Sequence, residues 1–103
     1  MQQVHVTDHA LGKMRHGENR THLWHGEIVL ICQNGLYLCL GTREGTEFRL
    51  VCDLYLEKAT LLLVRRALHQ EVVVSVWETF YEGIPYIITD EQVGEARRLA
   101  IEP

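Results

Sequence analysis

The sequence predicts a single domain of the α+β class, with five short strands and one helix between the third and fourth strands. Three observations support this. Apolar and polar residues alternate over Thr46–Asp53, "TEFRLVCD", as in a half-buried strand. Residues 54–70 sort onto two sides of a helix. Residues 71–79, "EVVVSVWET", form the most β-prone run of the chain.

Length and composition limit what the chain can be. Its 103 residues fit one domain, residues 1–103, and 47% hydrophobic residues allow a core without metal or disulfide staples. Its three cysteines, an odd number within hydrophobic runs, indicate reduced core thiols. The net charge of −4 argues against a general nucleic-acid coat protein.

No apolar stretch reaches the length of a membrane helix, which needs about 20 residues. The first residues, "MQQVHVTDHALGK", lack the apolar middle of a signal peptide. A cytoplasmic protein without membrane contact is therefore expected.

The segment 1–22 is expected to be an arm or a short helix. Asp8 is a good N-cap, and "HALGKMRH" has room for about two helical turns before the polar "GENRT". No strand is predicted here.

Two apolar runs follow in "GEIVLICQNGLYLCLG". Asn34-Gly35 between them is a strong hairpin signal because both residues accept positive φ. "TREGT" provides a second turn before Thr46–Asp53. These segments together predict a three-stranded meander.

Residues 54–70 are predicted to form the central helix. A strand of that length would exceed the usual ~5–6 residues and would contain no turn residues. Asp53 stands where a cap is needed, and basic residues lie toward the negative end of the helix dipole. The apolar side of this helix consists of Leu56, Ala59, Leu63, Val64 and Ala67, and the basic side of Lys58, Arg65, Arg66 and His69.

The last third of the chain returns to strands. After "EVVVSVWET", Pro85 opens a short final strand, "PYIITD". Thr89-Asp90-Glu91-Gln92 has the pattern of a capping box, which predicts a C-terminal helix over 90–101.

The resulting order of strand, strand, strand, helix, strand, strand resembles the OB-fold, a small five-stranded barrel, over residues 23–89. The resemblance is carried by "WHGEIVLICQNGLYLCLG", "TEFRLVCD", "YLEKATLLLVRRALHQ", "EVVVSVWE" and "IPYIITD". It implies binding of oligonucleotides, oligosaccharides or protein partners. The loops "QNG" and "FYEG" are shorter than that pattern requires, which favours a flat protein contact or a small ligand over a long oligomer.

Tyr37, Arg49 and Trp77 are the candidate ligand-binding residues. Strand alternation predicts that all three face outward, as an aromatic and cationic platform for stacking bases or sugars. The alternative is that Trp77 covers the core, because tryptophan is highly buried on average. A shift of the strand by one residue would bury it.

Five of the six histidines lie in the first 25 residues. His5 and His9 are spaced to share a helical face, but no metal-ligand motif surrounds them, so no metal site is predicted. "HALGKMRHGENR" resembles the start of small bacterial ribonuclease-toxin-like domains, although Lys13 stands where arginine is commoner. That resemblance implies His9 as an acid or base and Arg20 as a phosphate ligand.

The expected function is a non-enzymatic binding or assembly module that needs no cofactor. A homodimer is expected because a small sheet has exposed edges, and a protein partner or small ligand fits better than nucleic acid. The enzyme alternative is a ribonuclease-like toxin domain that uses His9 and Arg20. A purely structural oligomer is the third possibility.

Overall fold

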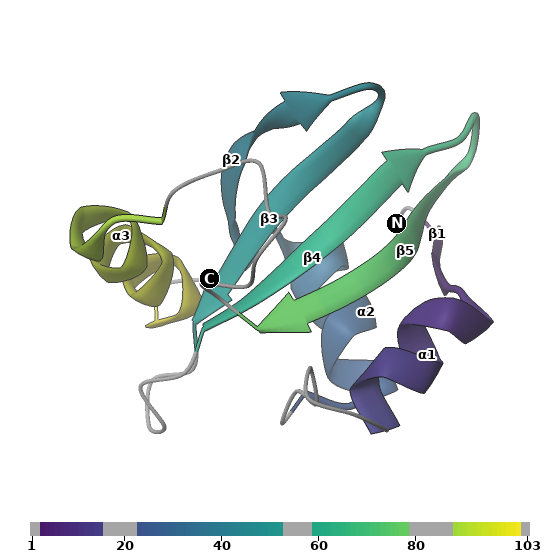
Figure 1. Cartoon of the computed structure of the whole chain (residues 1–103), viewed down its shortest axis with the longest axis horizontal. Coiled ribbons are helices and arrows are strands. Elements are labelled where there is room, and N and C mark those ends of the chain that lie inside the picture. Colours follow the sequence, from purple (N-terminus) through teal and green to yellow (C-terminus); the bar gives the residue numbers. More distant parts are fainter. Residues whose placement is uncertain (1–2, 16–22, 53–58, 79–87, 102–103) are drawn as a thin grey trace.

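The computed structural model describes residues 3–15, 23–52, 59–78 and 88–101. They form an α+β fold with one five-stranded sheet and three helices (Figure 1). In chain order the elements are β1 (Gln3–Val6), α1 (Asp8–Arg15), α2 (His25–Asn34), β2 (Leu38–Arg43), β3 (Thr46–Cys52), β4 (Ala59–Arg66), β5 (Gln70–Glu78) and α3 (Asp90–Ile101).

The strands are arranged in the order β1-β5-β4-β3-β2. β1 runs parallel to β5, and the other neighbours are antiparallel. β1 and β2 are therefore the two edges of an open sheet. The predicted barrel is not confirmed, and the observed order of helices and strands differs from the one on which the OB-fold resemblance was based.

The first predicted strand is wrong, because its residues belong to α2. Asn34-Gly35 ends this helix instead of turning a hairpin. Gly35 has a φ of 66°, and the N–H groups of Gly35 and Leu36 both donate to the carbonyl of Ile31. A glycine in the left-handed region serves a helix C-terminus as well as it serves a hairpin, so the local signal supports both structures.

The predicted helix over 54–70 is also wrong. Ala59–Arg66 is β4, the central strand, which pairs with β3 and β5. Leu61 and Leu62 point to opposite faces of the sheet, and both are fully buried. A strand covered on both faces has a continuous apolar sequence without alternation, which sequence periodicity does not distinguish from a buried helix.

Several predictions are confirmed. β3 and β5 lie where the β-prone runs predicted them. The turn before β3 contains Glu44 and Gly45 with φ values of 51° and 79°, the positive values that two-residue hairpin turns require.

The helices at the two ends of the chain are confirmed as well. α1 is capped by Thr7 and not by Asp8, because the Thr7 hydroxyl accepts the N–H of Ala10 at 3.2 Å. α3 begins with the predicted capping box, in which Thr89 and Gln92 each bond the other's backbone N–H. Most of the expected strand "PYIITD" lies outside the described residues, and Ile88-Thr89 is not strand.

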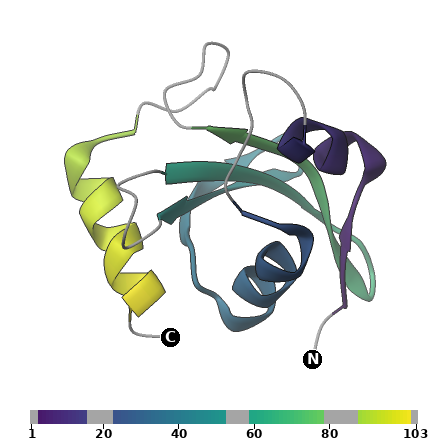
Figure 2. The same cartoon turned by 90° about the horizontal axis from the view of Figure 1, so that it is seen from below.

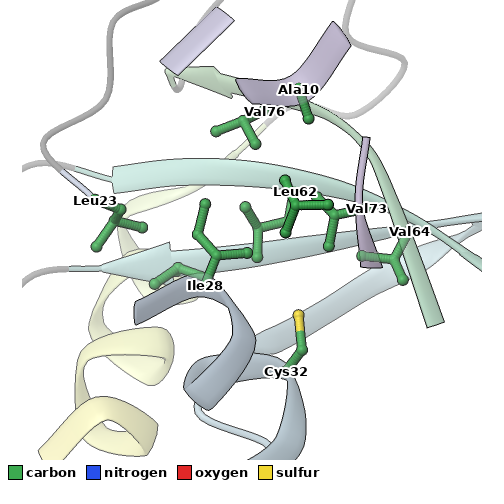
Figure 3. Packing of buried hydrophobic residues seen from close by; sticks show 10 residues of the cluster. Ala10, Leu23, Ile28, Cys32, Leu62, Val64, Val73 and Val76 are labelled. Carbon is green, nitrogen blue, oxygen red and sulfur yellow. The ribbon is translucent and has the colours of Figure 1, made fainter. Parts of the chain in front are cut away.

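The two faces of the sheet carry different helices. α1 and α2 cover one face, and α3 covers the other near β2 and β3, as Figure 2 shows. Figure 3 shows Leu23, Ile28 and Cys32 opposite residues of β4 and β5, namely Leu62, Val64, Val73 and Val76. The buried cluster of the first face consists of Val6, Ala10, Leu23, Ile28, Cys32, Val51, Leu62, Val64, Val73 and Val76, and that of the second face of Leu50, Cys52, Ala59, Ile88 and Ala96.

Candidate functional site

Arg49 is the largest fully buried side chain of the described chain, with 0% exposure. Alternation along β3 sends Leu50 to the α3 face and Val51 to the α1/α2 face. Arg49 shares the face of Val51 and so enters the α1/α2 side of the sheet. A buried charge is expensive unless it is paired and hydrogen-bonded, so its partners decide what this position does.

The partners are two glutamates. Nη1 of Arg49 donates to Oε1 of Glu71 at 2.9 Å, and Nη2 contacts Oε2 of the same carboxylate. Nε donates to Oε1 of Glu47 at 2.8 Å. This is the two-pronged geometry in which arginine binds a carboxylate most strongly. Burial opposes the charge of Arg49, but the bonds from Glu71 and Glu47 outweigh it, and the pKa of Arg49 rises above its ordinary value.

Tyr37 completes the inner part of this cluster. The guanidinium carbon of Arg49 lies 4.1 Å from the centre of the Tyr37 ring, a cation–π contact. Burial raises the pKa of Tyr37 and also that of the neighbouring Cys32 thiol, while the charge of Arg49 acts in the opposite direction on both. Cys32 is therefore a protonated, buried thiol at neutral pH.

Arg66 closes the cluster at the surface. Its side chain is 66% exposed, and its nitrogens lie 3.6 Å from Oε2 of Glu47 and from Oε2 of Glu71. Two arginines thus face two glutamates, and their charges balance. We call Arg49, Glu71, Glu47, Arg66 and Tyr37 the arginine cluster.

The predicted platform is only partly assembled. Tyr37 and Arg49 do come together, but the expectation that Arg49 faces solvent is wrong. Trp77 lies on the other face, because Arg49 pairs with Leu62 whereas Trp77 pairs with Leu61. The three side chains do not share one exposed surface, and ligand binding by any of them stays a prediction.

The histidine candidates lie apart from the arginine cluster. His5 is exposed on β1 and His9 is exposed on α1. Arg20, the predicted phosphate ligand, lies outside the described residues. Among the residues that the structure does describe, no group of three or more His, Cys, Asp or Glu side chains is placed to hold a metal ion.

The outer surface of α2 carries a feature that the sequence analysis missed. Trp24 is 64% exposed and Leu30 is 56% exposed. Carbons of the Trp24 ring lie 2.5, 2.7 and 3.2 Å from the point where a Cβ at Gly26 would stand. The indole thus occupies space that only glycine leaves free. The sequence does contain Trp-x-Gly, at the residues where α2 begins. Its meaning was missed because these residues were predicted to lead into a strand.

The Trp24 backbone is held as well. Its N–H donates to the Glu27 carboxylate at 3.4 Å, three residues into the first turn of α2. Gly26 lies in the same first turn, and its lack of a side chain leaves the space that the Trp24 ring occupies. The start of α2 thus combines an outward-facing tryptophan, a bond to its backbone and a glycine that leaves room for its ring.

Comparisons with protein-family models, with curated proteins and with solved structures found no match. In the described ranges, no helix is both long enough and apolar enough to cross a membrane. The functional argument therefore depends on the arginine cluster and on the outer surface of α2.

Proposed function

We propose that the chain is a non-enzymatic binding or assembly module. The first support is the state of the arginine cluster. Arg49 has no exposed surface, and its nitrogens are engaged by Glu47 and Glu71. A group that binds substrate or transfers a proton must reach it. Arg49 reaches only its own neighbours, so the buried part of the cluster serves the fold.

The observation that carries the proposal is Trp24. Tryptophan is enriched among the residues that dominate protein interfaces, since one side chain buries a large area at a small entropy cost. Here the ring is exposed and is seated against Gly26, with Leu30 exposed further along the same helix. Preorganisation of this kind reduces the entropy lost on binding. The chemistry fits a protein surface with apolar side chains.

The test uses Trp24 as a reporter. The chain has two tryptophans, so in the Trp77→Phe variant Trp24 is the sole indole. Its emission is measured as the protein is diluted about a hundredfold. A single-stranded oligonucleotide and an oligosaccharide are then titrated at fixed protein concentration. Sedimentation runs in parallel on the native protein.

We expect the native protein to self-associate and the Trp24 emission to shift with concentration or with a probe. Gly26→Ala is the matched control, because it displaces the ring and leaves Trp24 in the chain. A native protein that stays monomeric, with an emission that no probe alters, rejects the module.

A ribonuclease-like domain is the second candidate, favoured by the position of α1. The resemblance places a His-Ala helix before a sheet. α1, with His9 exposed and Ala10 buried, precedes β2 to β5, although β1 comes before it and α2 follows it. The long helix that the sequence analysis predicted over residues 54–70 would not suit such a domain. The structure has a strand, β4, at Ala59–Arg66 instead.

An RNA degradation assay separates the two candidates. RNA is incubated with native protein and with the His9→Ala and Arg20→Ala variants, and its length is followed on a gel. Degradation by the native protein that both substitutions abolish establishes the enzyme. Intact RNA in every sample rejects the ribonuclease and retains the binding module.

A further inference from the structure

β1 has backbone groups that point away from the sheet. Thr7 donates its N–H to the Val73 carbonyl of β5 at 3.1 Å. Successive residues of a strand direct their N–H and C=O groups to opposite sides, so His5 also faces β5, while Val4 and Val6 face outward. β1 is an edge of the sheet, and no described strand lies beyond it (Figure 1).

The two edges differ in how they are protected. β2 has a register shift between Cys39 and Gly41 and ends in Arg43, and bulges and charges are the devices that blunt an edge. β1 pairs with β5 in regular register. Its sequence "QVHV" contains no proline, lysine or acidic residue. Of the two edges of the described sheet, β1 is the one that carries none of these devices.

Side chains of β1 hold it in place for pairing. Val6 is buried in the cluster of the α1/α2 face, and Val4 packs against that cluster. Thr7 adds a bond from its hydroxyl to the Val74 carbonyl at 3.4 Å. An edge that is already extended and anchored loses little conformational entropy when a further strand pairs with it.

We propose that β1 pairs antiparallel with β1 of a second copy of this chain, about a two-fold axis at His5. This inference rests on the proposed assembly function and names its interface. Val4 of each copy lies opposite Val6 of the other, and each such pair exchanges both backbone hydrogen bonds. His5 faces its own symmetry mate across the axis.

A second copy is chosen over a foreign strand because the segment is symmetric about His5. Val-His-Val presents the same side chains in both directions, so antiparallel self-pairing places valine opposite valine on the α1/α2 face. Gln3 falls opposite Thr7, and no like charges meet between Gln3 and Thr7. Such self-complementarity is what a two-fold interface requires.

The first test is Val4→Pro against Val4→Ala. Proline at position 4 removes an outward N–H and leaves the bonds to β5 intact, as edge strands allow. Alanine shortens the same side chain and keeps that N–H. By sedimentation, we expect the dimer dissociation constant of Val4→Pro to exceed that of Val4→Ala at least about tenfold, since each dimer loses two hydrogen bonds. Circular dichroism confirms that both variants are folded.

The second test is a crosslink. In a Cys39→Ser background, which removes the exposed cysteine, His5→Cys places two thiols across the axis. Residues opposite each other in a non-hydrogen-bonded pair have Cα atoms about 4.5 Å apart, within reach of a disulfide. A mild oxidant is expected to yield a covalent dimer. Gln3→Cys in the same background is the control, because position 3 does not face itself.

The outcomes separate this inference from the proposed function. A native dimer that Val4→Pro weakens and His5→Cys crosslinks supports the β1 interface. A native dimer that resists Val4→Pro and forms no crosslink at position 5 overturns the interface and leaves the assembly function standing. A native protein that is monomeric at every concentration overturns the interface, and it overturns the proposed function as well only if no probe alters the Trp24 emission.

Discussion

Neighbouring residues of β3 are buried on the two faces of the sheet by opposite chemistry. β3 sends Arg49 to one face and Leu50 to the other, and both side chains have 0% exposure. Leu50 needs only apolar neighbours, which the α3 face supplies with Cys52 and Ala59. Arg49 needs two carboxylates and an aromatic ring, drawn from β3, β5 and the segment after α2.

The difference between these two kinds of burial shows which of them restricts the pairing of the strands more tightly. An apolar cluster tolerates exchange among side chains of similar volume. A buried ion pair tolerates little displacement, because a misplaced partner leaves a charge unpaired. As a hypothesis, the arginine cluster fixes the register of β3, β4 and β5, while the apolar clusters on the two faces provide most of the net stability.

The largest effect is expected from Glu71→Gln. The change keeps the shape of the side chain but leaves the Arg49 charge buried beside a neutral amide. We expect a loss of about 3–5 kcal/mol in the free energy of unfolding. Urea unfolding followed by circular dichroism measures it.

Two controls sharpen that result. Glu47→Gln removes one bond at a partly exposed position and is expected to cost about 1–2 kcal/mol. The double change Arg49→Met with Glu71→Leu removes both charges and is expected to restore stability to near the native value. If the double variant is as unstable as Glu71→Gln, the charges themselves stabilise the fold and the hypothesis is wrong.

On the α3 face, Leu50→Ala is expected to cost about 2–4 kcal/mol through lost burial and the cavity left behind. The same urea titration measures it. Leu50→Met, which nearly conserves volume, is the control and is expected to lose less than about 1.5 kcal/mol. Equal losses in the two variants would show that the shape of the side chain, and not its buried apolar area, determines the stability at this position.

Alkaline pH acts on both faces with a smaller effect. Burial raises the pKa of Cys32 on one face and of Cys52 on the other. The folded chain then holds protons that the unfolded chain releases, so stability falls as the pH rises above the ordinary thiol value of 9.0.

Tyr37 adds to the same trend above its ordinary value of 10.0, because its pKa is also raised. Melting temperatures between about pH 8 and pH 10.5 measure the loss. Cys52→Ala should flatten the decline by removing one titrating thiol. A melting temperature that does not change across this range contradicts the prediction.

The smallest effect is expected from Arg66→Ala at the rim of the arginine cluster. Its side chain is 66% exposed, and its contacts of 3.6 Å with the two glutamates are screened by water. The cost should stay below about 1 kcal/mol in the urea titration. A loss as large as that of Glu71→Gln would place Arg66 among the residues on which burial of Arg49 depends.

Part of the candidate site was accessible from the sequence. Strand alternation placed Tyr37 beside Arg49, and the two side chains are in contact, but Tyr37 lies before β2 and Arg49 is buried where the alternation had it face outward. It could not reveal Glu71 as the partner of Arg49, because that contact spans the sheet from β3 to β5. The seat of Trp24 on Gly26 was hidden by the strand prediction for the residues of α2.

The sequence by itself determined the elements whose signals are local. These are the β-prone runs of β3 and β5, the positive-φ turn at Glu44-Gly45, and the capping box at Thr89 and Gln92. Tertiary structure decided the rest. β4 is a strand because both of its faces are covered, β1 because β5 lies beside it, and Arg49 is buried because two distant carboxylates meet it there. Each of these depends on contacts far apart in sequence, which local periodicity and propensity do not encode.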